Sequence, residues 1–77
     1  MDMKEFCQRI ESILEMDPGT IKPETRLDSL DAWDSVAVIS FIAMADQDYQ
    51  VTVPPKSISE CQTIADLADA ITACKAG

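Results

Sequence analysis

Apolar residues near the N-terminus recur at the spacing that places them on one face of a helix. The members of this stripe are Met3, Phe6, Cys7, Ile10, Ile13 and Leu14. The other side of the same helix carries Lys4, Glu5, Arg9, Glu11 and Glu15. The turn residues at positions 17–19, Asp-Pro-Gly, are expected to end it.

A second helix is predicted over residues 34–49, with Asp34 as its N-cap. One stripe is formed by Val38, Phe41, Ile42, Ala45 and Tyr49. The remaining sides are also apolar, through Val36, Ala37, Ile39, Ala43 and Met44. A helix that is apolar all round is normally central in a larger protein, and 77 residues cannot cover every side. Either part of this surface is exposed as a binding site, or a loop covers it.

The other segments complete a helical architecture. Residues 20–33 form a long ordered loop, a kind that is often functional, and its core anchors are expected to be Ile21, Leu27 and Leu30. Two prolines make residues 50–55 extended, while a strand over residues 51–53 would have no partner. Residues 56–61 have room for one helical turn around Ile58.

The last helix begins with Thr63 and Asp66, which resemble a capping box with Asp in place of Glu. Its apolar stripe is Ile64, Leu67, Ala68, Ile71 and Cys74. The predicted fold is therefore all-α, a small four-helix bundle of three main helices and one short helix. A long loop joins the first two helices, and residues 1–77 make a single domain.

Composition restricts the function. Six basic residues against fourteen acidic ones give a net charge of −8, which excludes nucleic-acid binding and docking on an anionic membrane and favours a partner with a basic face. No apolar run is long enough to span a bilayer. The chain has no histidine, the usual general base and commonest metal ligand, so we expect no enzyme and no permanent metal site. Asp28, Asp31 and Asp34 recur at every third residue, but the central glycine and the distal glutamate of an EF-hand calcium loop are missing. These three carboxylates therefore do not predict a calcium site.

The three cysteines, Cys7, Cys61 and Cys74, are odd in number and widely spaced. They form no metal or disulfide pattern, so free, mostly buried thiols in a reducing compartment are expected. The N-terminus lacks the apolar region of a signal peptide. These features together predict a cytoplasmic protein.

Two Asp-Ser pairs are candidates for chemistry, one at Ser29 and one at Ser35. The simplest interpretation of each pair is a turn or a helix cap. Neither serine can be a triad nucleophile, because no histidine or substitute base accompanies it. If one of them reacts, another protein has to activate it.

The run from Trp33 to Val36 (Trp-Asp-Ser-Val) opens an apolar helix, with Tyr49 fourteen residues after the serine and Val-Pro at positions 53–54. This arrangement resembles the acyl/peptidyl carrier protein family over nearly the whole chain, from about residue 4 to about residue 74. That family places an Asp-Ser-aliphatic motif at the start of its second helix, and an aromatic residue closes that helix. Counting from Ser29 would put Ala43 at the aromatic position, so Ser35 is the candidate attachment site.

The resemblance implies a non-catalytic carrier, and we expect it to be a stand-alone protein. A phosphopantetheinyl transferase would move 4′-phosphopantetheine from coenzyme A onto Ser35, and the thiol of that arm would carry acyl or aminoacyl groups as thioesters. The enzymes served would be of the fatty-acid, polyketide or nonribosomal-peptide type, and the cargo stays open. Asp34 would help to hold Mg²⁺ transiently during the modification.

Loading and condensing enzymes with basic faces would dock around the serine of a monomeric carrier. Residues 23–50 hold six acidic residues against one arginine, and Ser40 and Gln47 stand where the family's second helix often carries acids. The expected contact residues are therefore both apolar and acidic: Val36, Ile39, Ala43, Met44, Asp31, Asp46 and Asp48. The alternative is an unmodified helical adaptor that binds a basic partner through its apolar second helix.

Overall fold

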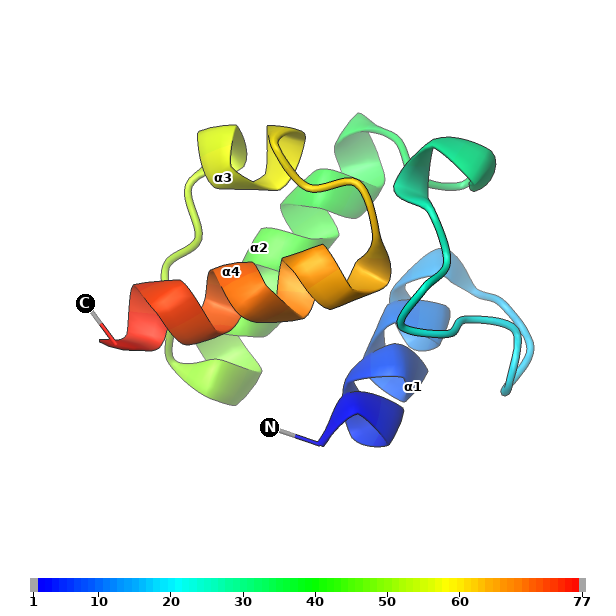
Figure 1. Ribbon diagram of the computed structural model, residues 1–77, viewed down its shortest axis with the longest axis horizontal. Coiled ribbons are helices and arrows are strands. Elements are labelled where there is room, and N and C mark those ends of the chain that lie inside the picture. The colour runs from blue at the N-terminus through cyan, green and yellow to red at the C-terminus, as the bar shows by residue number, and fades with distance from the viewer. Residues whose placement is uncertain (1, 77) are drawn as a thin grey trace.

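The computed structural model describes residues 2–76 and forms a small helical bundle (Figure 1). Its elements are α1 (Met3–Leu14), the 3-10 turn η1 (Leu27–Ser29), α2 (Ser35–Tyr49), α3 (Pro55–Ser59) and α4 (Ile64–Ala76). Within these residues the structure has one isolated antiparallel β-bridge, between Arg26 and Thr63. The predicted all-α fold of three main helices and one short helix is confirmed.

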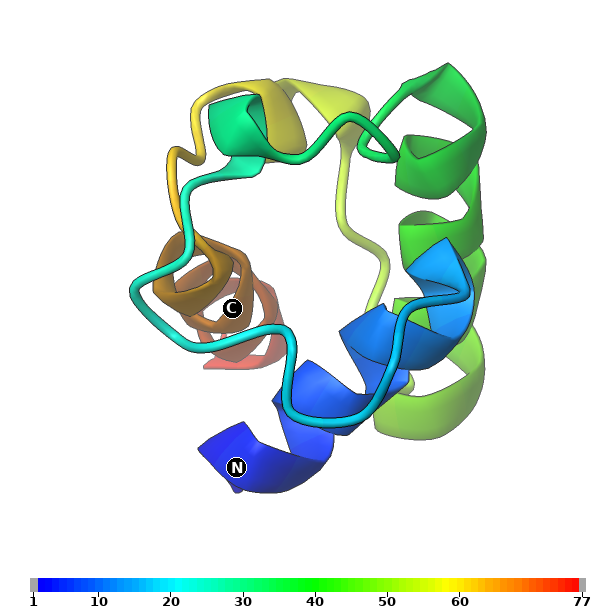
Figure 2. The same cartoon turned by 90° about the vertical axis from the view of Figure 1, so that its right-hand side faces the viewer.

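The helices pack around one core. In Figure 1 α4 crosses in front of α2, and Figure 2 shows the loop between α1 and α2 running across the side of the bundle. The fully buried large side chains come from three helices and the 50–54 linker: Phe6, Ile10, Phe41, Val53, Ile64, Leu67 and Ile71. The stripes predicted for the first and last helices are thus confirmed. Each helix buries one face and so contributes to the hydrophobic stabilisation of the whole.

A chain of aromatic rings crosses this core. The ring centroids of Trp33 and Phe41 lie 6.1 Å apart, and those of Phe41 and Phe6 lie 6.2 Å apart, both in edge-to-face geometry. The ring of Tyr49 lies 6.4 Å from that of Phe6. Such pairs add to the stability gained from burial alone, so the aromatic residues fix α2 against α1 and against the loop that precedes α2.

Glu11 corrects one prediction. It was expected on the polar side of the first helix, yet its side chain is only 4 % exposed. The reason is tertiary: the loop after α1 folds back and brings the Ile21 N–H to Glu11 Oε2, at 2.9 Å. The loop anchors themselves follow the prediction, with Ile21 and Leu27 buried and Leu30 half-buried against the core.

Replacing Glu11 with methionine is expected to destabilise the fold by about 1–3 kcal/mol, because the buried Ile21 N–H loses its acceptor. Glu11→Gln keeps an acceptor oxygen at the same place and is expected to cost less. Urea denaturation of both variants, followed by far-UV circular dichroism, measures the difference. Equal losses for the two substitutions would contradict a role for this hydrogen bond.

The helix ends depend on residues that the sequence did not mark. α1 ends at Leu14, three residues before the Asp-Pro-Gly turn, because Glu15 adopts the left-handed conformation at φ 57°. Gln50 ends α2 in the same way, at φ 56°. The capping box of α4 is confirmed: Thr63 Oγ1 accepts from the Asp66 N–H at 3.2 Å, and Asp66 Oδ2 accepts from the Thr63 N–H at 3.1 Å.

The backbone N–H groups of Gln62 and Thr63 both donate to the Asp66 carboxylate. They hold the pKa of Asp66 below its ordinary value, since hydrogen bonds to the charged form favour it. The cap of α4 is therefore fully formed at neutral pH.

Candidate modification site

Ser35 is the first residue of α2, and its side chain is exposed. Asp34 precedes it in an extended conformation and caps the helix, with Oδ1 accepting from the Ala37 N–H at 3.0 Å. This confirms the predicted N-cap. The first N–H groups of a helix have no intrahelical acceptor, and together with the helix dipole they favour an anion at this end. A phosphodiester on Ser35 therefore fits this position without any rearrangement of the bundle.

The other Asp-Ser pair is used by the loop itself. Ser29 lies at the end of η1, and its Oγ donates to the Arg26 carbonyl at 2.7 Å. Asp28 Oδ1 accepts from Arg26 Nε at 3.2 Å. The polar side chains of this pair thus stabilise one turn of the loop, as the simplest interpretation of the sequence predicted.

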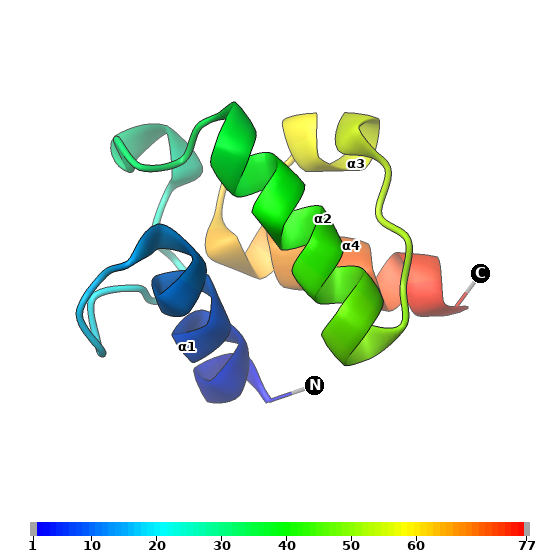
Figure 3. The same cartoon turned by 180° about the vertical axis from the view of Figure 1, so that it is seen from behind.

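The outer face of α2 is exposed. Val36 and Ile39 are 70 % and 67 % exposed, and Ala43 is also exposed. In Figure 3 no other segment of the described chain crosses in front of this helix. Of the two possibilities that the sequence left open, the structure therefore shows an exposed apolar surface. We call Val36, Ile39 and Ala43 the α2 patch, and it lies on the same helix as Ser35.

Two predictions for α2 need correction. Ala37 was placed outside the main apolar stripe, on the remaining sides of the helix, but it is buried, and together with Phe41 and Ala45 it forms the buried stripe. Met44 is half-buried and packs against the core, as do Val38, Ile42 and Tyr49. The buried stripe is therefore rotated toward Ala37, which lies four residues before Phe41 and eight before Ala45 on the same face of the helix.

Comparison with protein families matches residues 4–71 to the phosphopantetheine attachment site. The chain belongs to this family. The match covers α1, the long loop, α2, α3 and most of α4, so it includes both Asp-Ser pairs. Comparisons with curated proteins and with solved structures gave no match.

Family membership gives the chain its general role. The phosphopantetheine attachment domain takes up 4′-phosphopantetheine covalently and acts as a carrier, as the resemblance to acyl and peptidyl carrier proteins implied. Such domains work together with a phosphopantetheinyl transferase and with biosynthetic enzymes. The arm has to be joined to an exposed hydroxyl group, and Ser35 presents one at a helix end that favours phosphate.

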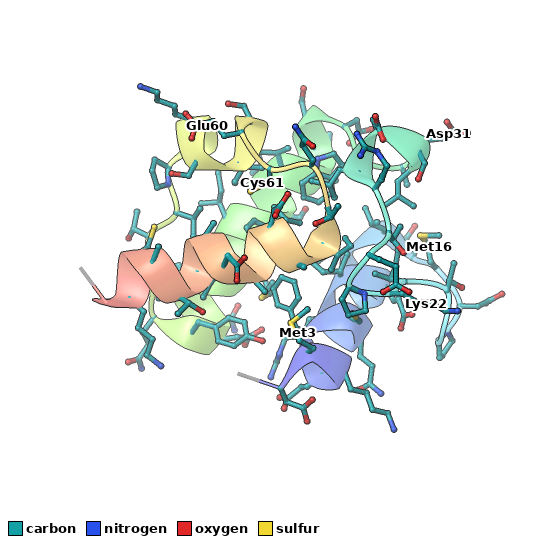
Figure 4. The ribbon with its side chains drawn as sticks, in the orientation of Figure 1. Met3, Met16, Lys22, Asp31, Glu60 and Cys61 are labelled. Carbon is teal, nitrogen blue, oxygen red and sulfur yellow. The ribbon has the colours of Figure 1, made fainter. Side chains whose placement is uncertain are left out.

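The acidic residues around α2 differ in whether their carboxylates are paired within the chain. Asp31, Asp34 and Asp46 are exposed, and Figure 4 shows Asp31 at the outer edge of the loop that leads into α2. Asp48 instead accepts from Arg9 at 2.8 Å. The Asp48 charge is thereby partly neutralised and joins α1 to the end of α2.

Arg9 is a residue whose role the sequence did not reveal. Its guanidinium also pairs with Glu5 at 2.8 Å and lies 5.6 Å from the centre of the Tyr49 ring. The pair with Glu5 can be predicted from the i, i+4 spacing on a helix. The contacts with Asp48 and Tyr49 join distant parts of the sequence and cannot be predicted in this way. Arg9 thus fixes the C-terminal end of α2, at the opposite end of the helix from Ser35.

The cysteines are free thiols, as expected, with Cys7 buried and Cys61 and Cys74 half-buried. Burial raises the pKa of Cys7 and of Cys61, so both stay protonated at neutral pH and are weak nucleophiles. Within residues 2–76 no three His, Cys, Asp or Glu side chains gather in a way that could hold a metal ion. No helix in this part of the chain is long and apolar enough to cross a membrane.

Proposed function

We propose that this chain is a stand-alone acyl carrier protein that is modified on Ser35. The phosphopantetheine arm forms a phosphodiester with Ser35 Oγ, and its thiol carries acyl or aminoacyl groups as thioesters between enzymes. The pathway is of the fatty-acid, polyketide or nonribosomal-peptide type. The observation that supports Ser35 is its place as an exposed first residue of α2, inside the region that matches the family.

The chain presents its serine and leaves the chemistry to the transferase. It has no histidine that could take the proton from Ser35 Oγ. Asp34 Oδ1 is used by the helix cap, and its exposed carboxylate still has an oxygen to offer to the Mg²⁺ of the transferase reaction. Mg²⁺ is commonly held by one or two carboxylates together with substrate phosphates. Asp34 therefore has two separable roles, capping α2 and holding the metal transiently.

Two substitutions at Asp34 separate these roles. Asp34→Asn keeps a side-chain oxygen that caps well, so its stability is expected to stay within about 0.5 kcal/mol of the wild type while loading of Ser35 becomes slow. Asp34→Ala is expected to slow loading and also to lose about 1 kcal/mol. Thermal denaturation and a time course of loading measure the two effects. If Asp34→Asn is loaded at the wild-type rate, the role of Asp34 in holding the metal is contradicted, whereas its role as the cap of α2 is not affected.

Enzymes that use the carrier are proposed to dock on the α2 patch and on the acidic side chains around it, Asp31, Asp34 and Asp46. Met44 and Asp48 lie at the edge of this surface and are less available, because Met44 packs inward and Asp48 is paired with Arg9. Exposed apolar side chains rimmed by one sign of charge suit a partner with an apolar pocket and basic residues around it.

The transferase itself can test this surface, because it has to dock near Ser35. Ile39→Ala is expected to raise the KM for the carrier about five-fold, the cost of a moderate interface contact of about 1 kcal/mol, with the stability unchanged. Ser12→Ala, an exposed change on α1, serves as the control. Equal KM values for the two variants would exclude Ile39 from the docking surface.

We further propose that residues 1–77 act as a single monomeric carrier domain in the cytoplasm and catalyse nothing themselves. The three free thiols support a reducing compartment. The direct test of the function is incubation of the wild-type chain with coenzyme A, Mg²⁺ and a broad-specificity transferase, followed by intact mass measurement. We expect a gain of one phosphopantetheine. No gain with several transferases would overturn the carrier function and leave the α2 patch as the surface of an adaptor.

A further inference from the structure

The segment that leads into α2, residues 30–34, depends on its side chains for its attachment to the bundle; Figure 3 shows it running from η1 to the start of the helix. In the described chain, its backbone groups form hydrogen bonds only within residues 27–38, that is, with η1, with itself and with the first turn of α2. Leu30 and Trp33 are half-buried against the core, and the other three side chains are exposed. Trp33 is therefore the last anchor before Ser35.

Trp33 occupies a position from which a side chain can control how the chain enters a helix. Asp34 is the N-cap of α2, so Trp33 is the residue before the cap and Val38 is the fourth residue of the helix. An apolar pair at these two positions forms a hydrophobic staple, which fixes the entry angle of the chain. Both side chains line the same hollow beside the start of α2, as the members of such a staple do.

The indole ring is also held by the core. It lies edge-on against Phe41, with 6.1 Å between the ring centroids, and Phe41 is completely buried. Phe41 belongs to the same helix as Ser35 and lies six residues further on. The Trp33 side chain therefore folds back along the helix that it precedes. Any shift of the segment before α2 has to separate the two rings and lose their contact.

The place of the Ser35 hydroxyl group matters for the proposed modification. Ser35 Oγ forms a bond to the phosphorus that bears pantetheine in coenzyme A, while the bond from this phosphorus to the bridging oxygen breaks. Adenosine 3′,5′-bisphosphate leaves with that oxygen, and the hydroxyl proton passes to a base of the transferase. The attacking and leaving oxygens have to lie roughly in line. A small displacement of the hydroxyl group therefore slows the transfer strongly.

We propose that Trp33 is a positioning residue for the modification of Ser35. Its packing beside Val38 and against Phe41 holds the chain where it enters α2. Ser35 Oγ and the Asp34 carboxylate thereby keep a fixed arrangement, in which the transferase can use both. This inference rests on the proposed modification of Ser35.

Steady-state kinetics of loading by the transferase test this role. In Trp33→Ala we expect kcat to fall about ten-fold and the KM for the carrier to change less than about two-fold, because the α2 patch stays in place. Trp33→Phe keeps a ring that can contact Phe41 and should retain kcat within about two-fold. Val38→Ala shortens the other member of the staple and should also lower kcat. Ile39→Ala, on the exposed neighbour, should raise KM and leave kcat unchanged.

Four results would overturn the inference. An unchanged kcat in Trp33→Ala would exclude the role, and a rise in KM alone would mean that the indole only contacts the transferase. A loss in Trp33→Phe as large as in Trp33→Ala would contradict a role of the ring contact. Val51→Ala truncates a buried residue beyond the other end of α2 and serves as the control. An equal loss of kcat in Val51→Ala would reduce the effect to one of general stability.

Amide hydrogen exchange of the unmodified chain gives a second measurement that needs no transferase. The Ala37 N–H donates to Asp34 Oδ1 at 3.0 Å, so its exchange reports whether the cap stays in place. Trp33→Ala should speed exchange at Ala37 about five-fold, whereas Val51→Ala should leave it unchanged, since helix ends open locally. Equal exchange at Ala37 in Trp33→Ala and in the wild type would contradict the inference.

Failure of the proposed function is distinguishable from failure of this inference. If the wild-type chain takes up no phosphopantetheine, the proposed function fails, whereas exchange at Ala37 still decides whether Trp33 holds the start of α2. If Trp33→Ala does not fold, shown by far-UV circular dichroism, Val38→Ala is the milder change in the same staple. Unchanged kcat and unchanged exchange at Ala37 in Val38→Ala would then overturn the inference.

Discussion

Replacing Ser35 with alanine is expected to abolish the uptake of phosphopantetheine completely. The change removes the one oxygen to which the arm can be joined at the start of α2, so no slower route remains at this position. Ser35 is exposed and begins a helix, where alanine is well tolerated, so the stability should change by no more than about 0.5 kcal/mol. Intact mass after incubation with coenzyme A, Mg²⁺ and transferase measures the loss.

Ser29→Ala is the matched control, because it alters the other Asp-Ser pair in the same way. Ser29 Oγ is bonded to the Arg26 carbonyl, and losing this exposed hydrogen bond costs at most about 1 kcal/mol. Loading should therefore proceed as in the wild type. A mass gain in Ser35→Ala, or no mass gain in Ser29→Ala, would show that Ser35 is not the attachment site and would refute the proposal.

The largest expected effect on stability comes from Phe41→Ala. Phe41 is fully buried and touches both Trp33 and Phe6, so its truncation should cost about 3–5 kcal/mol. A chain of 77 residues typically has a total stability of roughly 4–12 kcal/mol, so this variant is expected to lose a large fraction of its stability. Urea denaturation followed by far-UV circular dichroism measures the free energy of unfolding.

Ile39→Ala is the control for Phe41→Ala, since it truncates a large apolar residue on the exposed side of the same helix. Its free energy of unfolding should stay within about 0.5 kcal/mol of the wild type. Similar losses for the two variants would contradict the orientation of α2, and with it the exposure of the α2 patch. A selective loss in Phe41→Ala would support both.

The features that the sequence predicted correctly are those that depend on local rules. The stripe that contains Phe6 and Ile10 identified α1, and Asp34 as N-cap placed the start of α2. The capping box of Thr63 and Asp66 did the same for α4. Ser35 was chosen as the candidate site from its spacing to Tyr49 in the resemblance to the carrier family, and the N-cap at Asp34 places it at the start of α2.

The features that it missed depend on tertiary contacts or on unusual backbone conformations. Glu11 is buried because Ile21 brings an N–H to it from ten residues away, which no periodicity reveals. Glu15 and Gln50 end their helices in a left-handed conformation that glycine usually adopts. Because neither position holds a glycine, these two helix ends had no signal in the sequence. Ala37 is small enough to suit either side of a helix, and only packing decided which.

The account rests centrally on which atom carries the arm, and peptide mapping of the loaded wild-type chain tests this most directly. Trypsin leaves both serines in one peptide, since no Lys or Arg lies between Ser29 and Ser35, whereas chymotrypsin cuts after Trp33 and separates them. We predict that the mass of phosphopantetheine appears on the fragment that begins at Asp34 and that fragmentation assigns it to Ser35. Its appearance on the fragment that contains Ser29, or on any other part of the chain, would contradict the account.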